Sequence, residues 1–112
     1  MKTNKELPQN SNNLELWGGI ECTINRINNQ YFDQLEYANH YNREGDLDLI
    51  ADLGLKTLRY PILWERHQPD IQTEIDWAWT EKQLNILKDR GIKPIAGLLH
   101  HGSGPRFTDL LN

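Results

Sequence analysis

Two pairs of side chains in this sequence have residue types that chemistry at a protein site requires. Glu21 and Glu65 are carboxylates that neighbouring strands could bring together, and paired carboxyl groups can act as acid and base. No partner acid group or metal-binding pattern accompanies them, so a solvated or salt-bridged role is favoured. His100 and His101 carry imidazoles that metals bind, but adjacent residues on a strand point to opposite faces. We therefore expect no metal site and no cofactor.

The composition is that of an ordinary globular domain. The chain has 112 residues, of which 38% are apolar and 25% charged. Its net charge of -4 argues against a nucleic-acid partner, which would require a basic face. Four tryptophans and four tyrosines fit a sugar-binding cleft and an ordinary core equally well. The single cysteine, Cys22, excludes an internal disulfide, and a buried, inert thiol is favoured.

The chain shows no targeting or membrane segment. Residues 1–13 are polar and lack the apolar core of a signal peptide. No run approaches the ~18 apolar residues of a membrane span. We expect a cytoplasmic protein with a disordered arm over residues 1–13, no membrane partner, and a folded part over residues 14–112.

Two stretches share one order of helix, glycine and strand. A helix predicted over residues 42–53 ends at Gly54, and a strand follows over residues 56–63. A second helix ends at Gly91, and a strand follows over residues 94–99. A glycine after the last helical turn readily adopts the left-handed conformation. The two glycines lie about 37 residues apart, the length of one helix–strand unit with its loops. The repeat predicts the α/β class, with a parallel sheet and helical crossovers.

Local patterns refine these elements. In the first helix, Leu47, Ile50 and Leu53 recur at helical spacing and predict the buried stripe, which Leu49 widens. Pro61 predicts a bulge or the end of its strand. In the second helix, Thr80 and Gln83 predict a capping box, and Trp79 and Leu84 predict a hydrophobic staple. The inward-facing residues are predicted to be Leu84, Ile86 and Leu87.

The remaining segments complete about three βα units. Residues 14–20 are predicted as a first strand, and residues 65–75 as a connecting loop. Residues 21–41 are predicted as a long loop with a helical turn near residues 32–35, and long loops are often functional. Three parallel strands alone leave open edges and a half-covered sheet. The sequence therefore predicts part of a larger α/β structure.

The segment from Asp46 to Arg66 resembles the second unit of glycoside hydrolase family 1, the β-glucosidase family. There an aspartate opens the helix, a glycine closes it, and the strand reads Arg-Phe-Ser-Ile-x-Trp-x-Arg. Six residues match in register: Asp46, Gly54, Arg59, Ile62, Trp64 and Arg66. Three further segments are similar: Pro69, Gly91-Ile-Lys-Pro94, and His100 at the histidine of the family's His-Trp-Asp-x-Pro. Trp17-Gly18 is similar to the Phe-Gly of the family's first strand, which places Asn25 at its sugar-binding glutamine.

The resemblance covers roughly residues 14–105 and implies a (β/α)8 TIM barrel, of which this chain would supply the first three units. It implies hydrolysis of β-linked glycosides by a retaining mechanism, with catalytic glutamates on strands four and seven. Both glutamates, and the remainder of the barrel, are expected beyond Asn112, so this chain alone is expected to carry no catalytic residue.

By the same resemblance, Arg59 would support the nucleophile, and His100, Trp64 and Asn25 would contact the sugar. The alternatives are a structurally paired buried arginine for Arg59, a backbone-bonded histidine for His100 and a core residue for Trp64.

Departures from the pattern indicate a divergent member. Pro61 and Glu65 replace small polar residues, and His101-Gly-Ser-Gly-Pro105 replaces Trp-Asp-x-Pro. One alternative is a non-catalytic carbohydrate-binding barrel, and another is a domain of a sugar-nucleotide or polysaccharide pathway protein. A third is a (β/α)8 enzyme of another class, such as an aldolase or isomerase, which would need a lysine or metal ligands on later strands.

Overall fold

The computed structural model describes residues 14–20, 22–99 and 104–109 of the chain. The predicted arm over residues 1–13 lies outside this described part. The helices and strands are, in chain order, β1 (Trp17–Gly19), β2 (Ile24–Ile27), β3 (Gln30–Asp33), α1 (Gln34–Tyr37), the short 3-10 helix η1 (His40–Asn42), α2 (Asp46–Asp52), β4 (Thr57–Pro61), α3 (Trp64–His67), α4 (Ala78–Asp89) and β5 (Lys93–Gly97).

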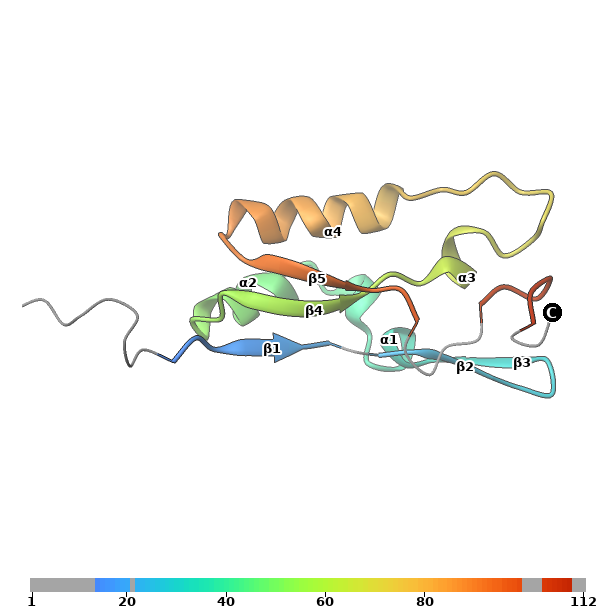
Figure 1. Ribbon diagram of the computed structural model, residues 1–112, viewed down its shortest axis with the longest axis horizontal. Helices are drawn as coiled ribbons and strands as arrows, with labels where there is room; N and C mark the ends of the chain where they lie inside the picture. The colour runs from blue at the N-terminus through green and yellow to red at the C-terminus, as the bar shows by residue number, and fades with distance from the viewer. Residues whose placement is uncertain (1–13, 21, 100–103, 110–112) are drawn as a thin grey trace, which may run out of the picture.

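A three-stranded parallel sheet organises the molecule. Its strand order is β1-β4-β5, with β4 in the centre. The arrows of all three strands point the same way in Figure 1. Helix α2 lies between β1 and β4 in the chain, and α4 between β4 and β5, as parallel pairing requires. The predicted α/β class with a parallel sheet is confirmed.

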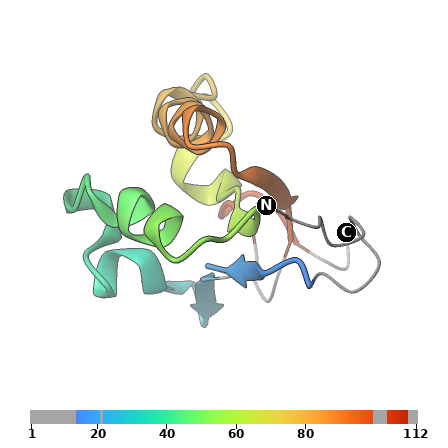
Figure 2. The same ribbon diagram turned by 90° about the vertical axis from the view of Figure 1, so that its left-hand side faces the viewer.

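The core lies between the sheet and its two longer helices. Figure 2 shows α2 and α4 on the same side of the sheet. Leu58 and Tyr60 of β4 point to this side and are buried. They pack with Leu47 of α2 and Leu87 of α4, so the predicted inward positions of both helical leucines are confirmed. The other side of the sheet carries neither helix (Figure 2).

The helix ends follow the predicted glycines. Gly54 and Gly91 have φ of +85° and +72°, the left-handed conformation expected after a last helical turn. Pro61 is the last residue of β4, as its missing N–H group suggested. The predicted burial of Leu53 is wrong, because α2 ends at Asp52 and Leu53 is a capping residue with 69% of its surface exposed. Leu49, predicted to widen the buried stripe, is also exposed.

The start of α4 differs from the predicted capping box. The helix begins at Ala78, so Thr80 lies inside its first turn and caps nothing. The Thr80 hydroxyl lies 2.6 Å from Nε2 of His67 instead, and both side chains are buried. Trp79 packs edge-on against the rings of His40 and Tyr41 rather than forming a staple. Tertiary contacts with aromatic and polar partners therefore decide the role of these two residues.

A β-hairpin replaces the long loop predicted over residues 21–41. Strands β2 and β3 pair antiparallel, and α1 and η1 follow them. Asn28 and Asn29 have φ of +52° and +63°, which closes a two-residue turn whose twist suits a hairpin. Helix α3 likewise occupies part of the loop predicted over residues 65–75. No helix in the described ranges is both long enough and apolar enough to cross a membrane.

Candidate functional site

The carboxyl ends of the three parallel strands meet at one end of the molecule. Figure 1 shows that hairpin β2–β3, helix α3 and the segment of residues 104–109 lie at this end. In parallel α/β barrels the loops at this end build the active site.

Arg59 lies on the side of the sheet away from the helices. It stands between Leu58 and Tyr60, whose side chains point to the core, so its own side chain projects to the opposite face. In the parallel register it is aligned with Gly19 of β1 and Ile95 of β5. Arg59 is exposed there, not buried. Its position on the central strand would allow it to contact a ligand on the side of the sheet away from the helices.

Trp64 is the first residue of α3, just beyond β4. Its ring packs edge-on against Phe107 with centroids 5.8 Å apart, and its Nε1 donates to Oε1 of Gln68. With 39% of its surface exposed, Trp64 is not a core residue. The ring thus lies at the strand-end region, in contact with the segment of residues 104–109.

The remaining residues singled out from the sequence are Asn25, His100, His101, Glu21 and Cys22. Asn25 is on β2 opposite Phe32, and its Oδ1 accepts a hydrogen bond from the Thr23 hydroxyl at 3.1 Å. His100, His101 and Glu21 lie outside the described residues. Cys22 is half-buried against the second core cluster rather than fully buried.

A cavity of about 240 Å³ opens between the hairpin, α3 and residues 104–106. Its walls combine three carboxylates, two guanidinium groups, a phenol and apolar side chains: Asp33, Glu36, Glu65, Arg66, Arg106, Tyr31, Ile24, Pro69 and Pro105. None of Arg59, Trp64 and Asn25 lines it. Sequence reasoning missed this cavity because it missed the hairpin, for which Asn28-Asn29 was the available signal.

Asp33 holds the inner wall of the cavity together. One carboxylate oxygen caps α1 by accepting the N–H groups of Leu35 and Glu36 at 2.9 and 3.1 Å. The other accepts the Tyr41 hydroxyl at 2.9 Å and the Arg66 guanidinium at 3.1 Å. Burial, and then the hydrogen bond to Asp33, raises the pKa of Tyr41.

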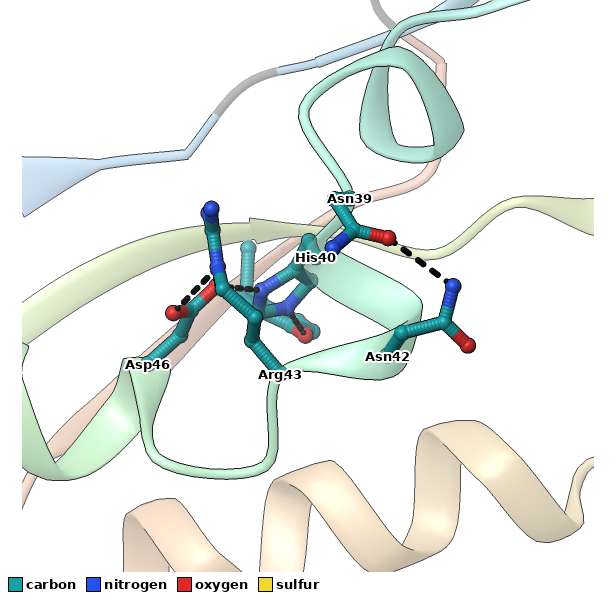
Figure 3. A network of polar contacts seen from close by, with 6 residues as sticks. Asn39, His40, Asn42, Arg43 and Asp46 are labelled. Atoms are coloured by element: carbon teal, nitrogen blue, oxygen red, sulfur yellow. Dashed lines mark hydrogen bonds and ion pairs between the residues drawn. The ribbon is translucent and has the colours of Figure 1, made fainter.

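A second network fixes strand β4 behind Arg59. Figure 3 shows His40 of η1 beside Asp46, the first residue of α2. Nδ1 of His40 lies 2.8 Å from the Asp46 carboxylate, and its Nε2 lies 2.7 Å from the buried hydroxyl of Tyr60. Arg43 also pairs with Asp46 at 3.0 Å.

The charges in this network shift two pKa values. Partial burial opposes ionisation of Asp46, but the hydrogen bonds from His40 and Arg43 outweigh it and lower the pKa of Asp46. Burial, together with the Asp46 charge, raises the pKa of Tyr60. The His40–Tyr60 contact is buried, whereas Arg43 lies at the surface, so the network can position β4, the strand that carries Arg59.

Within the described ranges, no three histidine, cysteine, aspartate or glutamate side chains gather as metal ligands would. The polar side chains that line the cavity are carboxylates, guanidinium groups and a phenol, which can form hydrogen bonds and ion pairs.

Comparison with curated proteins gives ten matches, and six of them are β-glucosidases. The chain resembles β-glucosidases. It is 37% identical to β-glucosidase 42 of Arabidopsis thaliana over 68 residues, which are 56% of this chain and 14% of that protein. It is 37% identical to a β-glucosidase of an Agrobacterium species over 67 residues, which are 56% of this chain and 15% of that protein. It is 29% identical to coniferin β-glucosidase of Pinus contorta over 87 residues, which are 75% of this chain and 17% of that protein.

The likeness to β-glucosidases confirms the predicted resemblance at the level of the family. No family model and no solved structure matches the chain. The chain spans between 14% and 17% of the length of the β-glucosidases that it matches. The low identity agrees with a divergent relative.

Proposed function

We propose that this chain is part of a (β/α)8 barrel protein that hydrolyses β-linked O-glycosides with retention of configuration. The position of Arg59 carries the proposal. It stands on the central strand of a parallel sheet, on the face away from the helices, within the segment that resembles the family's second unit. In a closed barrel this face lines the interior below the active-site end.

Retaining hydrolysis requires two carboxyl groups about 5 Å apart, one as acid/base and one as nucleophile. We place these glutamates on the fourth and seventh strands of the whole barrel, outside the 112 residues. The role of this chain is then to support and bind. The Arg59 guanidinium would hydrogen-bond the nucleophile and favour its ionised form.

The substrate contacts proposed for this chain lie at the strand ends. Trp64 would offer its ring to the sugar, and its exposure of 39% leaves ring surface available. His100 would donate to a sugar hydroxyl, and Asn25 would contribute an amide. The partners are thus a carbohydrate substrate and the remaining barrel strands. We also propose a cytoplasmic location for the whole protein.

The experiment uses the protein encoded by the complete reading frame and measures nitrophenol release from aryl β-glycosides. Arg59→Met removes a charge-assisted hydrogen bond worth about 1.5–3 kcal/mol, so kcat should fall roughly 10- to 150-fold. The acidic limb of the pH profile should also move to higher pH, because the nucleophile loses its neighbouring charge. A structural arginine would not move that limb.

The matched control is Arg90→Met. Arg90 pairs with Asp48 on the exposed surface between α2 and α4, so its removal should leave kcat and the pH profile unchanged. Failure of the whole protein to hydrolyse any aryl β-glycoside would contradict the proposed function.

A further inference from the structure

The cavity at the strand ends is not used by the proposed mechanism. We propose that it binds one uncharged sugar ring, as a subsite separate from the Arg59 face of the sheet. The choice of a carbohydrate rests on the proposed function, whereas the size, polarity and charge balance of the ligand follow from the cavity itself.

The cavity has a fixed outer wall. The segment of residues 104–108 is fastened to the hairpin by Arg26, whose guanidinium donates to the carbonyl oxygens of Thr108 at 2.9 Å and Pro105 at 3.4 Å. The Tyr31 hydroxyl donates to the Gly104 carbonyl at 3.2 Å. From the other side, the Gly104 N–H group donates to a carboxylate oxygen of Glu65 at 2.8 Å. Three elements distant in sequence are thus tied around one space.

The inner wall is equally constrained. Arg66 lies 3.9 Å above the ring of Tyr41 and pairs with Asp33, whose side chain is only 8% exposed. Arg106 lies over the ring of Tyr31 at 5.1 Å. Both guanidinium groups are therefore held by a ring, which lowers the entropy lost when they bind a ligand.

Hydrogen-bonding capacity remains at the rim. Within the described residues, Glu36 and Arg106 make no side-chain hydrogen bond, and only one oxygen of Glu65 has a partner. The cavity thus offers free acceptors beside free donors. Sugar hydroxyl groups donate and accept at once, and they can use both kinds of group.

The charge balance selects against anionic ligands. The walls carry three carboxylates, Asp33, Glu36 and Glu65, against the two guanidinium groups. A phosphate or carboxylate ligand would therefore face a net negative charge. An uncharged polyol meets no such repulsion, and the apolar side chains of Ile24, Pro69 and Pro105 can pack against its C–H groups.

The size limits the ligand to one ring. Cavities for drug-sized ligands measure about 300–1,000 Å³, and this one has about 240 Å³. The cavity depends on Gly104 and Pro105, the end of the segment that departs from the family's Trp-Asp-x-Pro. Gly104 and Pro105, the last two residues of that segment, therefore belong to a wall of the subsite.

The test is a titration of the isotope-labelled 112-residue chain with methyl β-D-glucoside, followed by amide NMR. The amides of Glu36, Gly104 and Arg106 should shift together and give one dissociation constant. Glu36→Gln should weaken binding about tenfold, because it replaces a hydrogen bond to a charged acceptor by a neutral one. The control Glu44→Gln changes an exposed carboxylate that pairs with Lys82 outside the cavity, and binding should be unchanged.

Inorganic phosphate is the charged probe, and it should cause no shift at these amides. Three results would overturn the subsite: no shift with the glucoside, equal affinities for the two variants, or binding of phosphate at the same amides. The titration does not depend on hydrolysis. Binding by the chain without hydrolysis by the whole protein would reject the proposed function alone, and hydrolysis without binding at the cavity would reject the subsite alone.

Discussion

Replacement of Tyr60 by phenylalanine tests whether the buried histidine network holds β4 in place. The Asp46 carboxylate can only accept, so Nδ1–H of His40 donates to it, and in the neutral imidazole Nε2 then accepts the Tyr60 hydroxyl. Tyr60→Phe keeps the fully buried ring but leaves Nε2 of His40 without a donor, in a side chain that is 5% exposed. A buried polar atom that loses its partner costs about 1–3 kcal/mol. The unfolding equilibrium constant should therefore rise by roughly 5- to 150-fold.

Urea unfolding of the chain, followed by tryptophan fluorescence, measures this cost from the shift in midpoint at a common m-value. Tyr37→Phe is the control, because Tyr37 is 82% exposed and its hydroxyl makes no hydrogen bond within the described residues. It should change the free energy of unfolding by less than about 0.5 kcal/mol. If Tyr60→Phe costs no more than Tyr37→Phe, the hydrogen bond contributes nothing and the reasoning about the network is refuted.

Three further predictions concern the same fold. Asp46→Asn should destabilise the chain most above about pH 4. The pKa of Asp46 is lower in the folded chain than in the unfolded chain, so its ionised carboxylate stabilises the fold at a pH above the unfolded pKa of ~3.9. This stability is lost as the pH falls through the folded pKa. Urea midpoints between pH 7 and pH 2.5 should show the two proteins converging in acid, and a constant gap would contradict the pairing. Leu87→Ala should lower the free energy of unfolding by about 2–5 kcal/mol in the same assay, since Leu87 is fully buried; a loss below about 1 kcal/mol would mean that α4 is not packed on the sheet. Gly91→Ala should lower the free energy of unfolding by about 1 kcal/mol or more, because alanine disfavours the φ of +72° at this position. An added Cβ meets no atom within 4 Å, so a steric clash does not contribute to this loss. Thermal unfolding measures it, and an unchanged melting temperature would argue against that backbone conformation.

The repeated elements could be predicted from the sequence because local signals and tertiary structure agree there. Gly54 and Gly91 end their helices as predicted, and Leu47 and Leu87 face the core. The glycine at a helix end and the spacing of apolar residues along a helix both act over only a few residues of sequence. The parallel sheet follows from their repetition.

The roles of Thr80 and Trp79 could not be predicted, because distant partners decide them. Thr80 follows a capping pattern, but a hydrogen bond with His67, thirteen residues earlier, takes its hydroxyl. Trp79 follows a staple pattern, but the rings of His40 and Tyr41 surround it. A local pattern cannot show a competing partner elsewhere in the fold.

In the candidate site, too, locally determined features could be predicted and features that depend on distant contacts could not. Arg59 could be placed from its strand and register, since alternation along β4 fixes which side it faces. The cavity could not, because it forms only when the hairpin meets residues 104–106 through contacts such as Arg26 with Thr108. These contacts span more than half the chain.

The two networks suggest how the site is supported. Asp33 joins the hairpin to Arg66 and Tyr41 at the strand ends, and Asp46 joins α2 to Tyr60 through His40. Each uses a carboxylate to hold a tyrosine, one near the cavity and one beside Arg59. Carboxylates that accept from several donors fix side chains in one arrangement, as a binding site requires.

The coding sequence beyond the codon for Asn112 tests the central claim most directly. We predict that it continues into a fourth barrel strand followed by Asn-Glu-Pro, and later into a strand that ends in a second glutamate. These two carboxyl groups are what retaining hydrolysis needs and what the supporting residues Arg59 and Trp64 would serve. Barrel strands without those two glutamates, or a stop codon directly after Asn112, would contradict the glycosidase assignment.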